Sequence, residues 1–368
     1  MLRSALRTWP VLLLLASLIL APAAHAEKTS WFVNATSGND NNPGTRTSPC
    51  QTINGCLSKN VQPGDTIHVE AGSYGCFYVD KSGVAGAPIS FVGASGVIVN
   101  TGNCGNGVYI ATNQHDIAIR GFEIGGFSAA GIGATGGGSY NLTFSRNVIH
   151  DNGGGGVIVV GADCVTISGN RVYNNAYTET NSTSGISIYE FVLQPNCSAL
   201  ADGFRNHITR NEGFNNDNRF PGATDGNCII VDDMRHTQSA PHVVYNGPTL
   251  IYGNYCHDNG GRGIHVYSSD NVSIYGNTVA NNCKNLAICL ANPPDGVGEI
   301  NCGACGGVIA NNNVITPSAN EYGVAYRGQS GMPNAADGNR ICASGFGDHY
   351  FDPMQGNTWG VHNRSNCG

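Results

Sequence analysis

The chain has 368 residues, of which 52 are glycine, 43 are asparagine and only 4 are lysine. Charged residues make up 12%, about half the usual share, and hydrophobic residues at 40% are enough for a packed core, which excludes wholesale disorder. Glycine, asparagine and threonine are poor helix formers, so the composition also excludes a helical bundle. The excess of turn-forming residues predicts a long all-β chain with very many turns.

Residues 1–26 have the pattern of a secretory signal peptide. A start that contains two arginines precedes an apolar run over 11–20, and residues 24–26 fit the small-x-small cleavage rule. The apolar run is too short to span a bilayer, and no later stretch is long enough either. We therefore expect a secreted protein, extracellular or periplasmic, that has no membrane partner.

Charge and cysteine content narrow the choice of partners. Without the two arginines of the signal sequence, the formal net charge falls from −7 to −9, and no basic patch exists to bind nucleic acid. All 14 cysteines lie in the mature chain, which predicts disulfides in an oxidising compartment, although their pairing cannot be read. The CxxC pair Cys302 and Cys305 lacks a second pair at matching spacing, so we favour a disulfide over a zinc site.

One motif recurs along the middle of the chain, first as residues 144–152 (FSRNVIHDN). Each copy has one asparagine at a fixed place: Asn147, Asn170, Asn211, Asn254 and Asn277, with a last copy over 310–315. A second asparagine follows five residues later, and then a second short strand: 156–160, 185–189, 228–232 and 263–267. Two short strands per repeat predict the coils of a parallel β-helix, whose aligned asparagines form a ladder of side-chain amides.

This pattern resembles the right-handed parallel β-helix proteins of the pectate-lyase-like superfamily. The start of the mature chain adds to the resemblance, because it carries the signature of secreted β-helix polysaccharide lyases: WFVN at 31–34, GNDNNPGT at 38–45, PGDTIHV at 63–69 and GSY at 72–74. The resemblance covers about residues 31–330. It implies the fold without fixing the activity, since the fold hosts lyases, hydrolases, epimerases and proteins without known catalysis.

The expected domain organisation follows from the extent of the repeat. We expect one β-helix domain with an N-terminal cap over 27–330, and a disulfide-containing C-terminal cap or tail of the same domain over 331–368. The step between ladder asparagines is 23 residues at both ends of the array but 41 and 43 residues in its middle. Insertions in repeat proteins form loops on one face, which is often the binding face.

The second strands align in columns that point alternately inward and outward. The expected inward columns are Ile132, Val157, Ile186, Ile229, Ile264 and Ala134, Val159, Ile188, Val231, Val266. At the expanded coils the outward columns change from small or apolar residues to Tyr189, Glu190, Asp232, Asp233, His265 and Tyr267. Asp225, Arg235, His236 and Arg262 flank them. Because adjacent coils lie about 4.8 Å apart, we expect these residues to form one cluster.

The carboxylates of this cluster suggest two kinds of chemistry. Carboxylates that lie close together repel, so they need a cation or one of them must hold a proton. Asp225, Asp232 and Asp233 are therefore candidate ligands of a metal ion, for which Ca²⁺ is the expected cofactor. The candidate catalytic residues are Asp232, Asp233, His265 and Arg262. The alternative for Asp225 is turn chemistry with Gly226.

The remaining members of the cluster are candidate substrate-binding residues: Tyr189, Glu190, Arg235, His236 and Tyr267. Tyrosine faces suit the C–H faces of pyranose rings, and an arginine fork suits a carboxylate. Each also has a structural alternative, because tyrosines on neighbouring strands form packing pairs and arginines balance nearby aspartates.

Three functions remain open. The favoured one is a secreted polysaccharide lyase, which needs a base for the C5 proton of a uronate and a group that neutralises the sugar carboxylate. The resemblance implies Ca²⁺ or arginine for neutralisation, but several calcium-dependent relatives use a lysine base, and no lysine lies near this cluster. His265, Arg262 or Tyr267 would then be the base.

The second function is a glycoside hydrolase with Asp232 and Asp233 as acid and base. The third is a non-catalytic carbohydrate-binding or surface protein. The motifs of β-helix polygalacturonases and uronan epimerases are absent, which argues against close membership of those groups. In all three cases the expected partner is a polysaccharide, with no nucleic acid, and the protein is expected to be a monomer.

Overall fold

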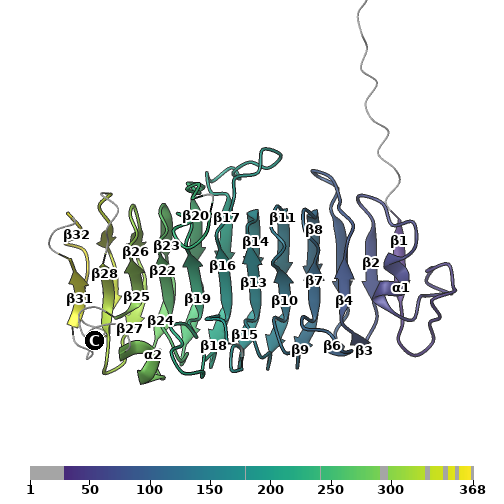
Figure 1. Ribbon diagram of the computed structural model, residues 1–368, viewed down its shortest axis with the longest axis horizontal. Helices are drawn as coiled ribbons and strands as arrows, with labels where there is room; N and C mark the ends of the chain where they lie inside the picture. Colours follow the sequence, from purple (N-terminus) through teal and green to yellow (C-terminus); the bar gives the residue numbers. More distant parts are fainter. Residues whose placement is uncertain are drawn as a thin grey trace, which may run out of the picture.

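The structure is a computed structural model that describes residues 29–178, 180–240, 242–290, 297–327, 332–342, 347–352 and 356–365. The predicted signal peptide lies outside these residues. The described chain winds into a right-handed parallel β-helix, and the predicted fold class is confirmed (Figure 1). Every strand pairing between neighbouring coils is parallel and in steady register along the helix axis, apart from one shift near Tyr74.

The strands form three long sheets, which we call the 12-stranded sheet, the corner sheet and the site sheet. The 12-stranded sheet contains β1 (Ser30–Val33), β2 (Thr66–Val69), β5 (Ile89–Gly93), β8 (His115–Arg120), β11 (Tyr140–Ser145), β14 (Asp163–Ser168), β17 (Asn206–Thr209), β20 (Thr249–Tyr252), β23 (Val272–Tyr275), β26 (Ile309–Asn311), β29 (Ala335–Asp337) and β32 (Thr358–Trp359).

The corner sheet contains β3 (Gly72–Gly75), β6 (Val97–Thr101), β9 (Glu123–Gly125), β12 (Val148–His150), β15 (Arg171–Tyr173), β18 (Glu212–Phe214), β21 (Tyr255–His257), β24 (Thr278–Ala280), β27 (Val314–Thr316) and β30 (Arg340–Ile341). The site sheet contains β4 (Phe77–Val79), β7 (Val108–Ile110), β10 (Ile132–Ala134), β13 (Val157–Val160), β16 (Ile186–Tyr189), β19 (Ile229–Asp232), β22 (Ile264–Tyr267), β25 (Gly298–Gly303), β28 (Tyr322–Arg327) and β31 (Gly347–Phe351). Two short helices, α1 (Ile53–Leu57) and α2 (Leu286–Leu290), complete the described elements.

Each coil has three strands, one more than the repeat predicts. The motif over 144–152 contains the end of β11 and all of β12, and the chain turns between them at Arg146 and Asn147. Arg146 has a φ of 55°, and Gly169, Arg210, Gly253 and Gly276 repeat this left-handed conformation in the following coils. A single sequence motif therefore spans two sheets, because only two residues separate the two strands in the sequence.

The predicted asparagine ladder is confirmed. The side-chain oxygen of each asparagine accepts hydrogen bonds from the backbone and side-chain nitrogens of the asparagine one coil earlier, as Asn170 does from Asn147 at 2.9 and 3.1 Å. The series continues through Asn211, Asn254, Asn277, Asn313, Asn339 and Asn363. A second ladder from Asn152 to Asn282 ends on Glu299, whose carboxyl accepts both bonds from Asn282.

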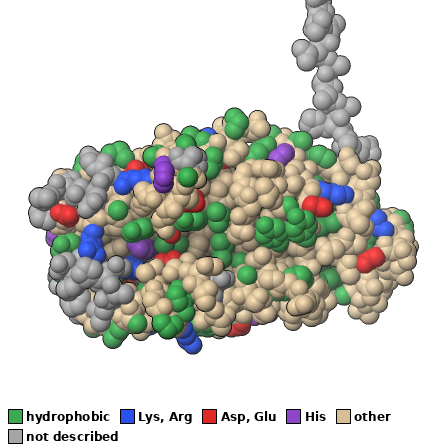
Figure 2. Space-filling model, viewed as in Figure 1, with side chains coloured by type: hydrophobic (Ala, Val, Ile, Leu, Met, Phe, Trp, Pro, Cys, Tyr) green, Lys and Arg blue, Asp and Glu red, His purple; other side chains and the backbone are tan. Residues whose placement is uncertain are grey.

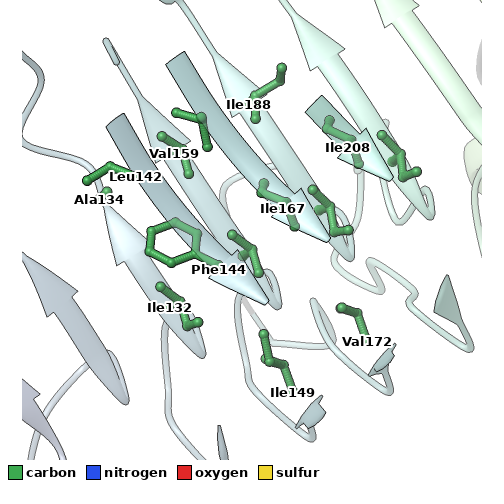
Figure 3. Packing of buried hydrophobic residues seen from close by; sticks show 14 of the residues in the cluster. Ile132, Ala134, Leu142, Phe144, Ile149, Val159, Ile167, Val172, Ile188 and Ile208 are labelled. Atoms are coloured by element: carbon green, nitrogen blue, oxygen red, sulfur yellow. The ribbon is translucent and has the colours of Figure 1, made fainter. Parts of the chain in front are cut away.

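The core lies between the three sheets. The predicted inward columns of the site sheet are buried, and they meet inward residues of the other two sheets, such as Phe144 and Ile167 of the 12-stranded sheet and Ile149 and Val172 of the corner sheet (Figure 3). This packing requires the outward columns of the site sheet to face away from the core. The opposite face of that sheet is therefore available for function.

The C-terminal region differs from the expected cap. Strands β29 to β32 continue all three sheets, and Asn339 and Asn363 continue the ladder, so the repeat persists to the end of the described chain. Between cysteines that the structure describes, six disulfides are formed, and Cys302 pairs with Cys305 as predicted. No helix in the described ranges is long and apolar enough to cross a membrane.

Candidate functional site

The outer face of the site sheet carries the candidate site. Tyr189, Asp232 and Tyr267 are paired in register on β16, β19 and β22, as predicted, and the column continues to Gly303 and Arg327. A parallel column two residues earlier contains Ser187, Ile230, His265 and Asn301. In Figure 2 acidic and histidine side chains gather in a recess of this face over β19 and β22.

The insertions border this face on both sides. In the expanded coils, one loop precedes each strand of the site sheet and another follows it, as residues 176–185 and 190–205 do for β16. Shelter on the outer face is uneven: His265 is only 7% exposed although it points away from the core, whereas Tyr267 is 42% exposed. The loops thus turn a flat sheet into a recess with a low dielectric.

Asp232 lies at the end of β19 near three other acidic groups. Burial raises its pKa to about 8, and repulsion from Asp225, Asp233 and Glu190 acts in the same direction. One of its oxygens, Oδ1, is buried without a hydrogen-bond partner. At neutral pH Asp232 therefore holds a proton, which is the state of a general acid.

Tyr189 and Glu190 lie one coil away from Asp232. Burial raises the pKa of Tyr189, and a hydrogen bond with Glu190 and the charges of the nearby carboxylates raise it further, so the phenol stays neutral. Glu190 follows the strand in a left-handed conformation, and its Oε1 is buried without a partner. These two residues and Asp232 form the acidic end of the site.

Arg262 and Asp225 form the opposite end, before β22 and β19. Arg262 is 2% exposed, donates from Nη1 to the carbonyl oxygen of Thr224 at 3.1 Å, and leaves its Nε without a partner. Burial raises the pKa of Asp225 to about 6, and the charge of Arg262 opposes that rise. The arginine and the aspartate thus partly neutralise each other at the base of the recess.

His265 lies between these two ends. Burial lowers its pKa well below the usual value for histidine, and the charge of Arg262 lowers it further, so the imidazole is neutral at physiological pH. Its ring lies 5.9 Å from that of Tyr267, and its Nδ1 is buried without a partner. Asp232 is diagonally across from His265 on the neighbouring strand, with roughly 8 Å between Cα atoms from the strand spacings.

Three predicted site residues have other partners. Asp233 accepts hydrogen bonds from the Thr237 backbone nitrogen and hydroxyl and from the Gln238 backbone nitrogen, at 2.6 to 2.7 Å, which lower its pKa although burial opposes this. Arg235 pairs with Asp270, and Nε2 of His236 lies 2.8 Å from the Phe191 carbonyl oxygen. The structure therefore places Asp233, Arg235 and His236 in the support of the loop after β19.

Asp225, Asp232 and Asp233, the expected Ca²⁺ ligands, do not form a group of three close ligand atoms among the described residues. The hydrogen bonds of Asp233 use both of its oxygens. Among the described residues, the one group of three close ligand atoms of the metal-binding types is Asp163, Cys164 and Cys197. Those cysteines form a disulfide, and Asp163 pairs with Arg205, so that group does not fit a metal either. The Ca²⁺ expectation therefore stays a prediction.

Sequence reasoning missed three residues that extend the site toward the C-terminus. Asn301 is adjacent to His265 in register and has a buried, unpartnered Oδ1. Gly303 lies closely against the Tyr267 ring, since a Cβ there would come within 3.0 Å of the ring and 3.8 Å of His265 Nε2. Arg327 follows in the same column and has no ion pair among the described residues. Extending the columns by two coils would have found all three.

Comparisons with known proteins support the fold. No family model matches the sequence, and no curated protein does either. The pectate lyase Pel9A has a similar structure, with a TM-score of 0.56 and 15% identity over 94% of this chain and 83% of that one. The complex of XylC with xylose has a TM-score of 0.50 and 11% identity, over 84% of this chain and 75% of that one.

An alginate lyase from Paenibacillus sp. str. FPU-7 gives a TM-score of 0.47 and 17% identity, over 92% of this chain and 99% of that one. The similarity to Pel9A and XylC, at identities of 15% and 11%, shows a shared fold rather than a shared activity. The chain accordingly shares the right-handed parallel β-helix fold.

Proposed function

We propose that the protein is a secreted enzyme that cleaves an extracellular, uronate-containing polysaccharide by β-elimination. The observation that supports this most is a set of buried polar atoms without partners on one outer face: Asp232 Oδ1, Glu190 Oε1, Arg262 Nε, His265 Nδ1 and Asn301 Oδ1. Each such atom costs about 1–3 kcal/mol when it stays unpaired. A polyhydroxylated ligand in the recess would supply the missing partners.

The protonation states suit an elimination. In the proposed reaction the neutral imidazole of His265 takes the C5 proton of the uronate, the C4–O4 bond breaks, and a C4=C5 double bond forms. Asp232 gives its proton to the departing O4, so the leaving group departs as an alcohol. Solvent then removes the proton from His265 and returns one to Asp232, which restores the starting state.

The sugar carboxylate would be neutralised by arginine. Arg327 ends the column that contains Asp232 and Tyr267, and Gly303, which has no side chain, lies between Arg327 and Tyr267 in that column. A guanidinium fork matches a carboxylate in two hydrogen bonds. Arg262 adds positive charge beneath the site, because it is buried near His265. The proton on C5 becomes more acidic when the adjacent carboxylate is neutralised.

A hydrolase is the second candidate, and one observation favours it. Asp232 holds a proton beside Glu190, which gives the pair of carboxyl groups that glycoside hydrolysis uses. Hydrolysis would add water across the glycosidic bond and leave no double bond. The two candidates therefore differ in their products rather than in their need for Asp232.

The test is product analysis on polygalacturonate, alginate and a neutral polysaccharide. Elimination predicts new reducing ends together with ultraviolet absorbance from the C4=C5 double bond, and only with the uronates. Reducing ends without that absorbance would favour hydrolysis. The Arg327→Ala variant should lose roughly tenfold or more in kcat/KM on the uronates, as expected for a lost charge-assisted pair. Absence of cleavage on the whole panel by the folded wild-type protein would overturn the proposal.

A further inference from the structure

Two tyrosines lie at the far end of the same face, toward the N-terminus. Tyr78 on β4 and Tyr109 on β7 are paired in register, and their rings stack with centroids 5.5 Å apart and planes at 19°. Tyr78 is 50% exposed. In Figure 2 hydrophobic side chains form a patch over these strands, well separated from the recess. Large exposed aromatic groups on a sheet face are candidates for ligand contact.

A hollow of about 320 Å³ lies beside these rings. Its lining includes the two tyrosines, the side chains of Asn54 and Asn106, and the disulfide between Cys76 and Cys104. The volume is at the lower end of the range for small-ligand sites. Aromatic faces next to amide groups suit a pyranose ring, which has apolar C–H faces and a rim of hydroxyl groups.

The polar groups of this hollow are held in place. Asn54 donates from Nδ2 to the Cys76 carbonyl oxygen and accepts from the Tyr78 backbone nitrogen, both at 3.1 Å. Asn106 Oδ1 accepts from the Ala130 backbone nitrogen at 3.0 Å, and no hydrogen bond within the described ranges uses its Nδ2. A fixed amide with a free donor costs little entropy when a hydroxyl binds to it.

The hollow and the candidate site belong to one continuous face. Tyr78 and Tyr109 lie in the same outward column as His265, and the residues between Tyr109 and His265 are Gly133, Ile158, Ser187 and Ile230. Five strand spacings separate Tyr109 from His265, or roughly 24 Å. None of the four intervening side chains is large and aromatic or charged, so an extended chain can lie along the column.

We infer that Tyr78 and Tyr109, with Asn106, form a distal subsite that binds one pyranose residue of the same polysaccharide whose cleavage is proposed above. The identity of the ligand rests on the proposed function, but the existence of the subsite does not. A polymer long enough to reach from His265 to Tyr109 gains the additional contact, whereas a short oligosaccharide bound at the recess does not. The enzyme therefore prefers long chains.

The chain offers a closely matched control. Tyr252 and Tyr275 form another stacked pair on neighbouring strands, with centroids 5.7 Å apart and planes at 21°, and Tyr275 is 44% exposed. That pair lies on the 12-stranded sheet, away from the site sheet. Substitution there removes an exposed stacked tyrosine without touching the proposed subsite.

The experiment measures retardation of the full-length protein in gels that contain polygalacturonate or alginate. We expect the Tyr78→Ala/Tyr109→Ala double variant to bind roughly three- to tenfold more weakly, in line with an aromatic contact, and Tyr275→Ala to bind like the wild type. The Tyr78→Phe/Tyr109→Phe variant, which keeps both rings, should retain binding. Thermal unfolding of each variant verifies that it is folded.

Chain-length dependence gives the second readout. In the alanine double variant, kcat/KM should fall on the polymer and stay unchanged on oligosaccharides too short to span the face. Equal binding by the double variant and the wild type, equal loss in Tyr275→Ala, or no binding of either polymer by the wild type would overturn the inference. Binding that depends on Tyr78 and Tyr109 in a protein that cleaves nothing would instead reject only the proposed function.

Discussion

The asparagine ladder and the candidate site both bury polar groups in register on stacked coils, but only the ladder supplies hydrogen-bond partners for all of them. In the ladder, Asn211 Oδ1 accepts two hydrogen bonds from Asn170, and its amide donates to the Ile167 carbonyl oxygen and to Asn254. At the site, Asp232 and His265 each leave a buried atom without a partner. The protein itself thus satisfies the hydrogen bonds of the ladder, whereas it leaves buried polar atoms of the site unpaired.

This difference indicates that the ladder stabilises the fold and that the site binds a ligand. Satisfied polar groups in a low dielectric fix the register of the coils and rigidify the fold, whereas unsatisfied ones lower stability. A folded protein that keeps several unsatisfied groups together on one face has a use for them, and a ligand is the simplest partner. The comparison predicts that changes in the ladder affect stability and that changes at the site affect activity.

The largest effect is expected from removal of the proposed base. His265→Gln should lower kcat on a uronate polymer by roughly 10²- to 10⁴-fold, the usual contribution of general base catalysis, because glutamine cannot accept the C5 proton. The measurement is initial rate by ultraviolet absorbance. His362→Gln, at an exposed histidine that pairs with Asp337, is the control and should leave the rate unchanged. A rate within threefold of the wild type in His265→Gln would remove this residue from the mechanism.

A ladder substitution should have the next largest effect, on stability. Asn211→Ala leaves the backbone nitrogen of Asn170 without an acceptor and removes one of the two acceptors of its Nδ2, which keeps the Phe144 carbonyl oxygen. The free energy of unfolding should fall by about 3 kcal/mol. Denaturant titration measures it. The exposed Asn215 has a φ of 51°, so Asn215→Gly keeps the backbone conformation and should change the stability by less than about 0.5 kcal/mol. Equal stability of the two variants would show that the ladder hydrogen bonds do not stabilise the fold.

Stability should also depend on pH through Asp232. Its pKa is about 8 in the folded protein and near the ordinary value of 3.8 in the unfolded chain. Folding thus favours the protonated form, and the free energy of unfolding should fall as the pH rises from about 4 to about 8. Asp232→Asn lacks this loss, so above pH ~8 it should be more stable than the wild type by about 2 kcal/mol or more. Parallel pH profiles of the two proteins would contradict the raised pKa.

The smallest effect is expected at Gly303. A valine there would press on the Tyr267 ring and displace it beside His265, and should lower kcat/KM on a uronate polymer about tenfold, which corresponds to about 1.4 kcal/mol. Thermal unfolding should show a folded protein. Gly86→Val tests the same change at an open position away from the site, although its φ of 78° adds local strain. Full activity of Gly303→Val would place the substrate elsewhere.

The sequence predicts most of the fold because the ladder and the strand columns are periodic. The alignment that puts Asp232 beside Tyr189 and Tyr267 follows from the shared apolar pattern of the second strands, and the register confirms it. The third strand of each coil is not predicted because only Arg146 and Asn147 separate β11 from β12, so the motif resembles a single strand. The C-terminal coils escape because their strands are short and the spacing of their asparagines changes.

The site is predictable only where strand alternation still applies. Asp233 follows Asp232 in a left-handed conformation, with a φ of 46°, so its side chain leaves the column and binds the next loop. Arg235 and His236 lie in that loop, and their partners, Asp270 and the Phe191 carbonyl oxygen, come from other coils. Contacts of this kind depend on how a loop folds back, and no repeat pattern encodes that.

The most direct test measures both activity and stability in two variants, Asp232→Asn and Asn211→Ala, at pH 7 and pH 9. We predict that the two substitutions have opposite effects. Asp232→Asn should lose cleavage of the uronate polymer and keep or gain stability. Asn211→Ala should lose stability and keep its rate per folded molecule. If Asp232→Asn retained its rate, or lost stability as Asn211→Ala does, the recess around Asp232 and His265 would be part of the framework and not an active site.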